Sequence, residues 1–467
     1  MCVLMNRNSL LLIRALLTIL LCNSVFVGAY LVASFIPSEK VVQSLQKSNL
    51  TGVLKTPMYS IERATTGWGI DYGTECVAIS NGLLKPTEFG EINPILFRFY
   101  DSYLPYGQND GTFDPCDGLQ KIISSDKIEK LNSESISYAR NWWGMSVLIQ
   151  IAIVLFGLAT AKTYLFIATI ITMAVFYYKF TQHIGNWKAG LVLLFPFIFF
   201  SDFQELHNSF PYSVYTIQIF ISASIIIGVI MSSDFSYHRL LNRAILLAAV
   251  YNFMFWFGFH IVITLVVSVI FLLLFQREKI AIVYGKILVY ILGSVVGFLS
   301  TTVIKWIVSI GIFGGEVSGS IKNAVQVRLS TGTEGLSGPL LDYSANFSQL
   351  PVPIRTVVLN LMVFASKIID PRNASALGVI LILFSLATIT TWFVYRFRIH
   401  NVLSRVSLAW FLPILMIPFI YLGMTANHSF NHAVIAYRSI PLSAGFLLAF
   451  VYQSYVNKHR NSVVTKN

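Results

Sequence analysis

Charged residues are scarce in this sequence. Only 12% of its 467 residues are Asp, Glu, Lys or Arg, whereas 55% are hydrophobic and 14% are aromatic. A soluble chain of this length carries about twice that share of charge. The mean hydropathy of +0.68 agrees with this composition. The sequence is therefore that of a membrane protein.

Several local motifs are missing as well. The sequence contains no glycine-rich phosphate-binding loop, no G-x-S-x-G turn and no C-x-x-C pair. Nucleotide-driven transport and soluble hydrolase chemistry therefore have no support. No segment has the alternating pattern of a membrane barrel strand, so we predict an all-α polytopic protein in a lipid bilayer. The net charge of +12 does not indicate nucleic acid, because Lys and Arg lie at the ends of apolar runs.

The basic residues predict the topology. Arg7 and Arg14 flank the start of a charge-free run at 15–38, which is long enough to cross a bilayer. This N-terminus and the basic C-terminal tail should both be cytoplasmic. About ten transmembrane helices fit the apolar runs. The predicted parts are a signal-anchor helix (1–38), a large extracytoplasmic loop with a juxtamembrane helix (39–162), a transmembrane bundle (163–304), a second extracytoplasmic loop (305–372), and C-terminal transmembrane helices with a cytoplasmic tail (373–467).

Two neighbouring apolar runs, 141–161 and 163–178, separate a predicted outer loop from a predicted inner one. An odd number of them must cross the membrane. We favour a crossing by 163–178, with 142–156 at the outer interface, because Trp142 and Trp143 suit the headgroup region. The alternative makes 189–201 a re-entrant segment, since a helix of that length falls short of the bilayer core.

The chain has only four cysteines, and two of them lie in the large outer loop. An oxidising compartment would allow a disulfide between Cys76 and Cys116, with a stabilisation of roughly 3–4 kcal/mol on the chain-entropy model. Two separate thiols are the alternative.

The densest polar segment surrounds Asp71 and Glu75, with Trp68 and Tyr72 beside them and a helix expected to end near Gly82. A spacing of four puts both carboxylates on one helix face, where one can act as a base and the other can orient it. The alternative is two solvated acids on a surface loop. The surrounding aromatic and glycine residues favour a sugar-binding site.

Two further polar clusters lie near predicted membrane boundaries. The first contains Asp202, Glu205 and His207 at the outer end of a short span, where acids are often functional and otherwise cap a helix. The second contains His428 and His432, followed by Arg438. An outward arginine can bind a lipid phosphate bidentately, or simply anchor in headgroups.

The order of these parts resembles the GT-C superfamily of integral-membrane glycosyltransferases. Members have one N-terminal span, a large first outer loop with an acidic residue, a juxtamembrane helix and a compact bundle. The resemblance is best over 62–231, where Asp71 precedes the helix ending near Gly82. Further along, a short span with Pro196 precedes Asp202.

This resemblance implies transfer of a sugar from a polyprenyl-phosphate donor to an acceptor glycan, glycolipid or protein on the extracytoplasmic face. Asp71 would deprotonate the acceptor, and Glu75 or Asp202 would orient it or hold a divalent cation such as Mg²⁺ or Mn²⁺. The residues expected to bind substrate are Trp68, Tyr72, Glu205, His207, His260, His428, His432 and Arg438.

Two other functions stay open. A polymerase or ligase of O-antigen type also acts on lipid-linked sugars outside the membrane, but its large outer loop usually comes late in the chain. A transporter of lipid-linked sugars needs no catalytic acid. The topology suits a bacterial cytoplasmic membrane, with an endomembrane as the alternative location.

Overall fold

The structure is a computed structural model, and it confirms a helical protein with apolar helices. It describes residues 7–48, 72–84, 100–104, 115–125, 128–137, 142–200, 206–207, 209–254, 266–267, 269–270, 273, 279–329, 348–365, 418–420, 422–423, 438–441, 443–446, 448–449, 452–453 and 456.

Four of the described helices are long and apolar enough to cross a membrane. They are α1 (Arg7–Ser34), α7 (Leu158–Ile184), α9 (Phe210–Ile230) and α12 (Ile280–Phe313). The shorter described helices of the bundle are α6 (Gly144–Phe156), α8 (Trp187–Phe200), α10 (Tyr237–Met254), α13 (Gly315–Leu329) and α15 (Val352–Ala365). A bilayer environment follows from these helices, whereas the count of about ten spans stays a prediction.

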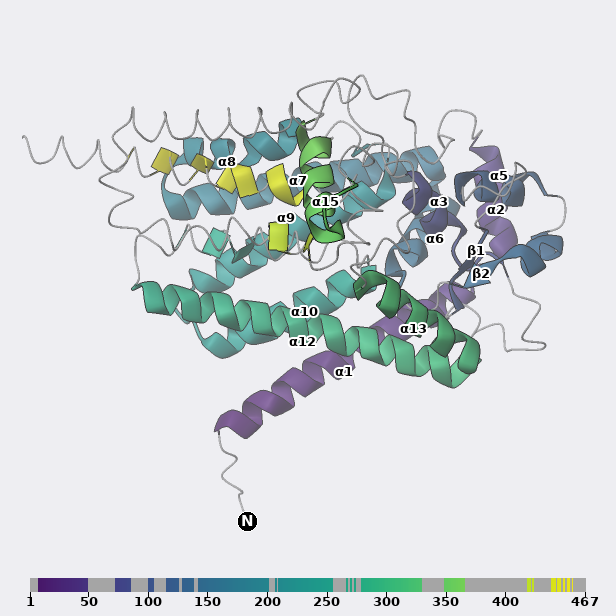
Figure 1. Cartoon of the computed structure of the whole chain (residues 1–467), viewed down its shortest axis with the longest axis horizontal. Coiled ribbons are helices and arrows are strands. Elements are labelled where there is room, and N and C mark those ends of the chain that lie inside the picture. Colours follow the sequence, from purple (N-terminus) through teal and green to yellow (C-terminus); the bar gives the residue numbers. More distant parts are fainter. Residues whose placement is uncertain are drawn as a thin grey trace, which may run out of the picture.

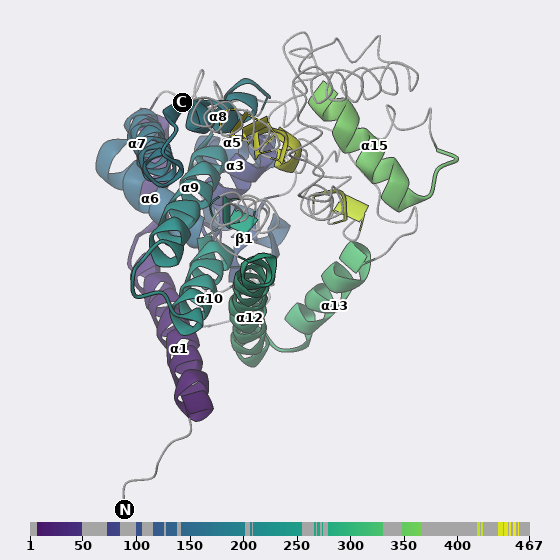
Figure 2. The same cartoon turned by 90° about the vertical axis from the view of Figure 1, so that its left-hand side faces the viewer.

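The helices of the bundle pack in two main pairs. Helix α10 lies along α12, and α7 lies along α9. Small residues bring the first pair close, because a Cβ atom at Gly297 would come within 2.3 Å of the Ile245 carbonyl oxygen. Figure 2 shows α1, α10 and α12 running side by side, with α13 and α15 on the opposite side of the molecule from α6 and α7.

A small cap closes one end of this bundle (Figure 1). It consists of α2 (Ser38–Lys47), α3 (Tyr72–Ser80), α5 (Pro115–Ser124), a 3-10 helix (Ile128–Glu134), and a two-stranded antiparallel ribbon of β1 (Ser102–Tyr103) and β2 (Ile136–Ser137). The predicted disulfide between Cys76 and Cys116 is present and joins α3 to α5. All these elements come from the predicted first outer loop.

Helix α3 ends as predicted, since Ser80 is its last residue and Gly82 follows with a φ of 72°. Every described side chain of α3, from residue 74 to residue 80, is buried. The cap and the bundle together cover the whole helix, because it packs against α5, α6 and α9.

Helices α6 and α7 are separate, with Gly157 between them at a φ of 77°. The two predicted apolar runs are thus separate helices, although α7 begins at Leu158, before the predicted boundary at 162, and which of them crosses the membrane stays a prediction. The expectation for Trp142 and Trp143 is wrong, however, because both are buried inside the protein and do not face headgroups. Trp142 can be buried because its indole Nε1–H donates to the carbonyl oxygen of Thr301 at 2.9 Å.

Two helix boundaries also differ from the sequence analysis. Helix α1 ends at Ser34, before Pro37, although the charge-free run continues to Ser38. Helix α12 continues to Phe313, past the predicted boundary at 304. Lys305 does not end this helix because an aspartate pairs with its ammonium group.

Candidate functional site

Many of the residues predicted to form the site lie outside the described part of the chain. These are Trp68, Asp71, Asp202, Glu205, His260, His428 and His432. The backbone of Tyr72 begins α3, and its side chain is also outside the description. The structure does place Glu75, His207 and Arg438.

Glu75 lies in the first turn of α3 and forms a buried ion pair with Lys162 of α7. The distance between Glu75 Oε1 and Lys162 Nζ is 2.6 Å, and the side chains are only 1% and 5% exposed. Water weakens the attraction between a carboxylate and an ammonium group at the protein surface, but the attraction is strong when both groups are buried. The alternative interpretation of Glu75 as a solvated acid is therefore wrong.

Arg438 lies at the same end of the bundle. Its guanidinium carbon is 3.4 Å from the centroid of the Tyr212 ring, in the first turn of α9, and the side chain is buried. Two residues earlier, the ring of Phe210 lies 5.7 Å from Lys162 Nζ. Arg438 is thus enclosed by protein and does not simply anchor in headgroups. The N-terminus of α9 has Lys162 and Arg438 beside it.

His207 lies just outside this group. Its Nε2 is 3.4 Å from the hydroxyl oxygen of Thr163, which follows Lys162 in α7. Its ring stands edge-on to Phe166, with 5.6 Å between centroids. The structure therefore places His207 on the exposed side of α7, next to the buried Glu75–Lys162 pair.

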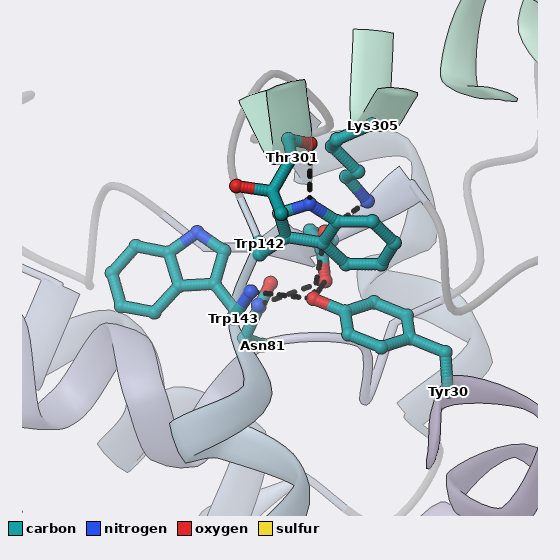
Figure 3. Close-up of polar contacts among 7 residues, drawn as sticks. Tyr30, Asn81, Trp142, Trp143, Thr301 and Lys305 are labelled. Atoms are coloured by element: carbon teal, nitrogen blue, oxygen red, sulfur yellow. Dashed lines mark hydrogen bonds and ion pairs between the residues drawn. The ribbon is translucent and has the colours of Figure 1, made fainter. Parts of the chain in front are cut away.

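A second buried centre was not predicted from the sequence. Asp101, which precedes β1, accepts a hydrogen bond from Lys305 Nζ at 2.8 Å. The Tyr30 hydroxyl donates to the same carboxylate at 3.2 Å, and the Asn81 amide donates to it at 3.1 Å. Figure 3 shows these side chains converging from α1, α12 and the end of α3.

Aromatic rings close this centre. The ammonium of Lys305 lies 4.9 Å from the Tyr30 ring centroid and 5.1 Å from that of Trp142. The Tyr30 hydroxyl in turn accepts a hydrogen bond from the backbone N–H of Trp143 at 2.5 Å. The carboxylate of Asp101 is therefore buried and accepts hydrogen bonds from three side chains.

Asp101 has an unusual backbone and an altered acidity. Its φ of 52° makes it the one residue other than glycine with a positive φ in the described part of the chain. Burial raises the pKa of Asp101 above its ordinary value, although the charge of Lys305 and the hydrogen bonds from Lys305, Tyr30 and Asn81 counteract this. A left-handed aspartate held by so many partners indicates a position fixed by its surroundings.

Helix α3 connects the two centres. Glu75 lies near its start, and Asn81 follows its last residue. Gln150 of α6 donates to the carbonyl oxygens of Ile79 and Asn81, at 3.0 and 2.8 Å, and so satisfies the C-terminal end of α3. The disulfide at Cys76 fixes α3 from the cap side.

The Asp101 centre was missed because its two charges are 204 residues apart in the sequence. One signal could have found it. Lys305 lies within a highly apolar helix, and a charged residue in such a position requires a partner. Among the described residues, no group of three His, Cys, Asp or Glu side chains could hold a metal ion.

Chemically, the cap end of the bundle offers a carboxylate and cations, together with a helix N-terminus that favours anions. Such an arrangement can bind a phosphate and orient a hydroxyl group. No family model matches this chain, and no curated protein or solved structure matches it, so these residues are the basis for assigning a function.

Proposed function

We propose that the protein is a membrane glycosyltransferase that moves a sugar from a polyprenyl-phosphate donor to an acceptor on the extracytoplasmic face. One observation supports this most directly. Glu75, Lys162 and Arg438 surround the first turn of α9, beneath the disulfide-linked cap. A lipid-linked donor needs a site for its phosphate at the boundary between bilayer and outer domain.

Arg438 and the N-terminus of α9 would bind the donor phosphate. A guanidinium can donate two parallel hydrogen bonds to a phosphate, and the helix end adds partial positive charge. Both interactions strengthen as negative charge develops on the departing phosphate, so they stabilise the transition state. The ion pair between Lys162 and Glu75 would fix the position of α3 against α7.

Asp71 would act as the general base, because it immediately precedes α3 and is four residues before Glu75. It takes the proton of the acceptor hydroxyl as that oxygen forms a bond to the anomeric carbon. The bond between this carbon and the phosphate oxygen breaks, and the lipid phosphate leaves with the electron pair. Glu75 acts as a positioning residue for this base through α3.

The test compares lipid-linked sugars and envelope glycans by mass spectrometry in cells with wild type, a deletion, Asp71→Asn or Glu75→Gln. General-base loss should lower transfer by about 10²–10⁴-fold and make the polyprenyl-phosphate sugar accumulate. Glu134→Gln is the matched control, because Glu134 pairs with Lys121 on the exposed side of the cap. Normal glycans in Asp71→Asn, with the deletion defective, would contradict the proposed base.

A polymerase or ligase of lipid-linked glycans is the second candidate. Two buried arginines favour it, Arg438 and Arg355 of α15. A polymerase would join two lipid-linked glycans, so its loss would leave single repeats on the carrier. The glycans made by cells with Arg355→Lys or Arg438→Lys distinguish polymerisation from sugar transfer. Glycans shortened to one repeat support polymerisation, whereas loss of one sugar from every repeat supports transfer.

A further inference from the structure

A cleft of about 750 Å³ lies toward the end of the bundle away from the cap. Four helices or their ends form it, since it contains residues from the first half of α1, the last turns of α7 and α9, and the start of α10. Figure 1 shows the N-terminal end of α1 pointing away from the cap.

The polar part of this cleft is strongly basic. It contains Lys179 of α7 together with Arg239 and Arg243 of α10, and its lining includes no acidic residue. The nearest acid along the chain, Asp234, forms an exposed ion pair with Arg239. Among the described side chains, Lys179 and Arg243 have no acidic partner within ion-pair distance.

Gly228 lies beside the lysine at the wall of the cleft. A Cβ atom at this position of α9 would lie 3.8 Å from Lys179 Nζ, which is an ordinary contact distance. A side chain much larger than alanine would therefore compete with the ammonium for this space.

The other part of the cleft is apolar, with Ile225 and Val229 on α9 and Leu246 on α10. Ser232 and Asn242 provide hydroxyl and amide groups next to the cations. A ligand that fits this surface has an anionic oxygen-rich group joined to a hydrocarbon part. Phospholipids with a net negative charge have this combination, and basic pockets between membrane helices bind their headgroups.

We propose that this cleft binds the phosphate group of an anionic phospholipid, with Lys179, Arg239 and Arg243 as its ligands. The site is separate from the glycosyl-transfer site proposed above and does not depend on it. Because the cleft joins α1, α7, α9 and α10, an occupied site would link four segments of the bundle. Binding to the folded state alone would raise its stability.

The test uses purified full-length protein in a neutral detergent. Native mass spectrometry measures binding of phosphatidylglycerol and of phosphatidylcholine, and thermal unfolding measures the shift in Tm. The double variant Lys179→Gln/Arg243→Gln should weaken phosphatidylglycerol binding about tenfold to thirtyfold. The matched control is Lys40→Gln/Lys322→Gln, which removes the same charge from exposed positions in α2 and α13.

Gly228→Leu supplies an independent variant. Gly228 is exposed, so this change fills the cleft while leaving every charge and the bundle core in place. It should reduce phosphatidylglycerol binding as strongly as the double variant, with the Tm of lipid-free protein unchanged. Equal binding by wild type and both variants would overturn the proposal.

A parallel titration with inorganic phosphate separates lipid from soluble ligands. We expect millimolar phosphate to leave the Tm unchanged while phosphatidylglycerol raises it. If phosphate alone gives the full shift, and phosphatidylglycerol binds no better than phosphatidylcholine, the cleft takes a soluble phosphate and the assignment to a lipid is overturned.

Discussion

Four buried cations in the described part of the chain lie against a carboxylate or an aromatic ring. Lys162 and Lys305 pair with carboxylates, Lys286 lies 4.3 Å from the Phe235 ring centroid, and Arg438 lies over Tyr212. An isolated charge in a lipid-facing helix costs several kcal/mol, so each position requires its partner. Removing a partner should therefore destabilise more than removing an exposed charge.

The Asp101 centre gives the sharpest case. Asp101→Asn leaves Lys305 charged and fully buried, which should lower the free energy of unfolding by about 3–5 kcal/mol. Lys121→Gln is the comparison, because its ion pair with Glu134 is solvent-exposed and should be worth about 0–1 kcal/mol. Thermal unfolding in detergent measures both.

The same measurement on Lys305→Met and on Asp101→Asn/Lys305→Met completes a double-mutant cycle. The double variant should be more stable than Asp101→Asn alone, since no charge is left without a partner. Additive losses would show that the two side chains do not stabilise each other.

A pH series on Lys305→Met tests the acidity of Asp101. Burial already raises its pKa, and removal of the Lys305 charge should raise the pKa further. The folded state then binds a proton that the unfolded state releases, so stability should fall as the pH rises above the ordinary aspartate range. Thermal unfolding of the variant between pH 4 and pH 8, with Asp101→Asn/Lys305→Met as reference, checks this, and parallel curves would contradict it.

Among the elements, the junction between α6 and α7 depends on one glycine. Gly157 has a φ of 77° and a ψ of 162°, a conformation that residues with a Cβ atom rarely adopt. Gly157→Ala should therefore lower stability by about 1–3 kcal/mol in thermal unfolding. Gly319→Ala is the control, because Gly319 is inside α13 with open space around it, and alanine there should be neutral or stabilising.

Helix α3 depends on its covalent link to α5. The variant Cys76→Ser/Cys116→Ser should lose about 3–4 kcal/mol, and a reducing agent should lower the Tm of wild type but not of the variant. The packing of α3 against α5, α6 and α9 should keep its fold at low temperature. A wild-type Tm insensitive to complete reduction would contradict this role.

The sequence predicted elements whose signals are local. Two cysteines in one predicted outer loop made the disulfide one of two alternatives, and Gly82 predicted the end of α3. The burial of Trp142 was not predictable, because its hydrogen bond goes to Thr301 in a distant helix. The pairing of Asp101 with Lys305 was also not predictable, because the two residues are far apart in the sequence and the neighbours of Asp101 are not distinctive.

On the scale of the whole molecule, the two ends of the bundle differ in chemistry. The cap end has a disulfide and charges paired inside the protein, whereas the other end has a basic cleft, where Lys179 and Arg243 have no acidic partner among the described side chains. This polarity is the one that the positive-inside rule associates with an outer and a cytoplasmic face.

Site-directed labelling tests the orientation. In a protein with Cys2 and Cys22 replaced by serine, Lys40→Cys in α2 should react with a membrane-impermeant maleimide in intact cells. Arg239→Cys in α10 should react only after permeabilisation. Both positions are exposed on the protein surface, so the protein itself does not shield either of them from the reagent. Labelling of both from one side would contradict the arrangement.

The long-range pairing of Lys305 also constrains how the protein is made. Insertion of α12 places an ammonium group within an apolar helix, at a cost of about 2.5–3.5 kcal/mol near a helix centre until a partner is present. That partner, Asp101, is synthesised 204 residues earlier and has its position set by the cap. We therefore expect α12 to be stable in the membrane only once the cap has folded and has brought Asp101 to Lys305.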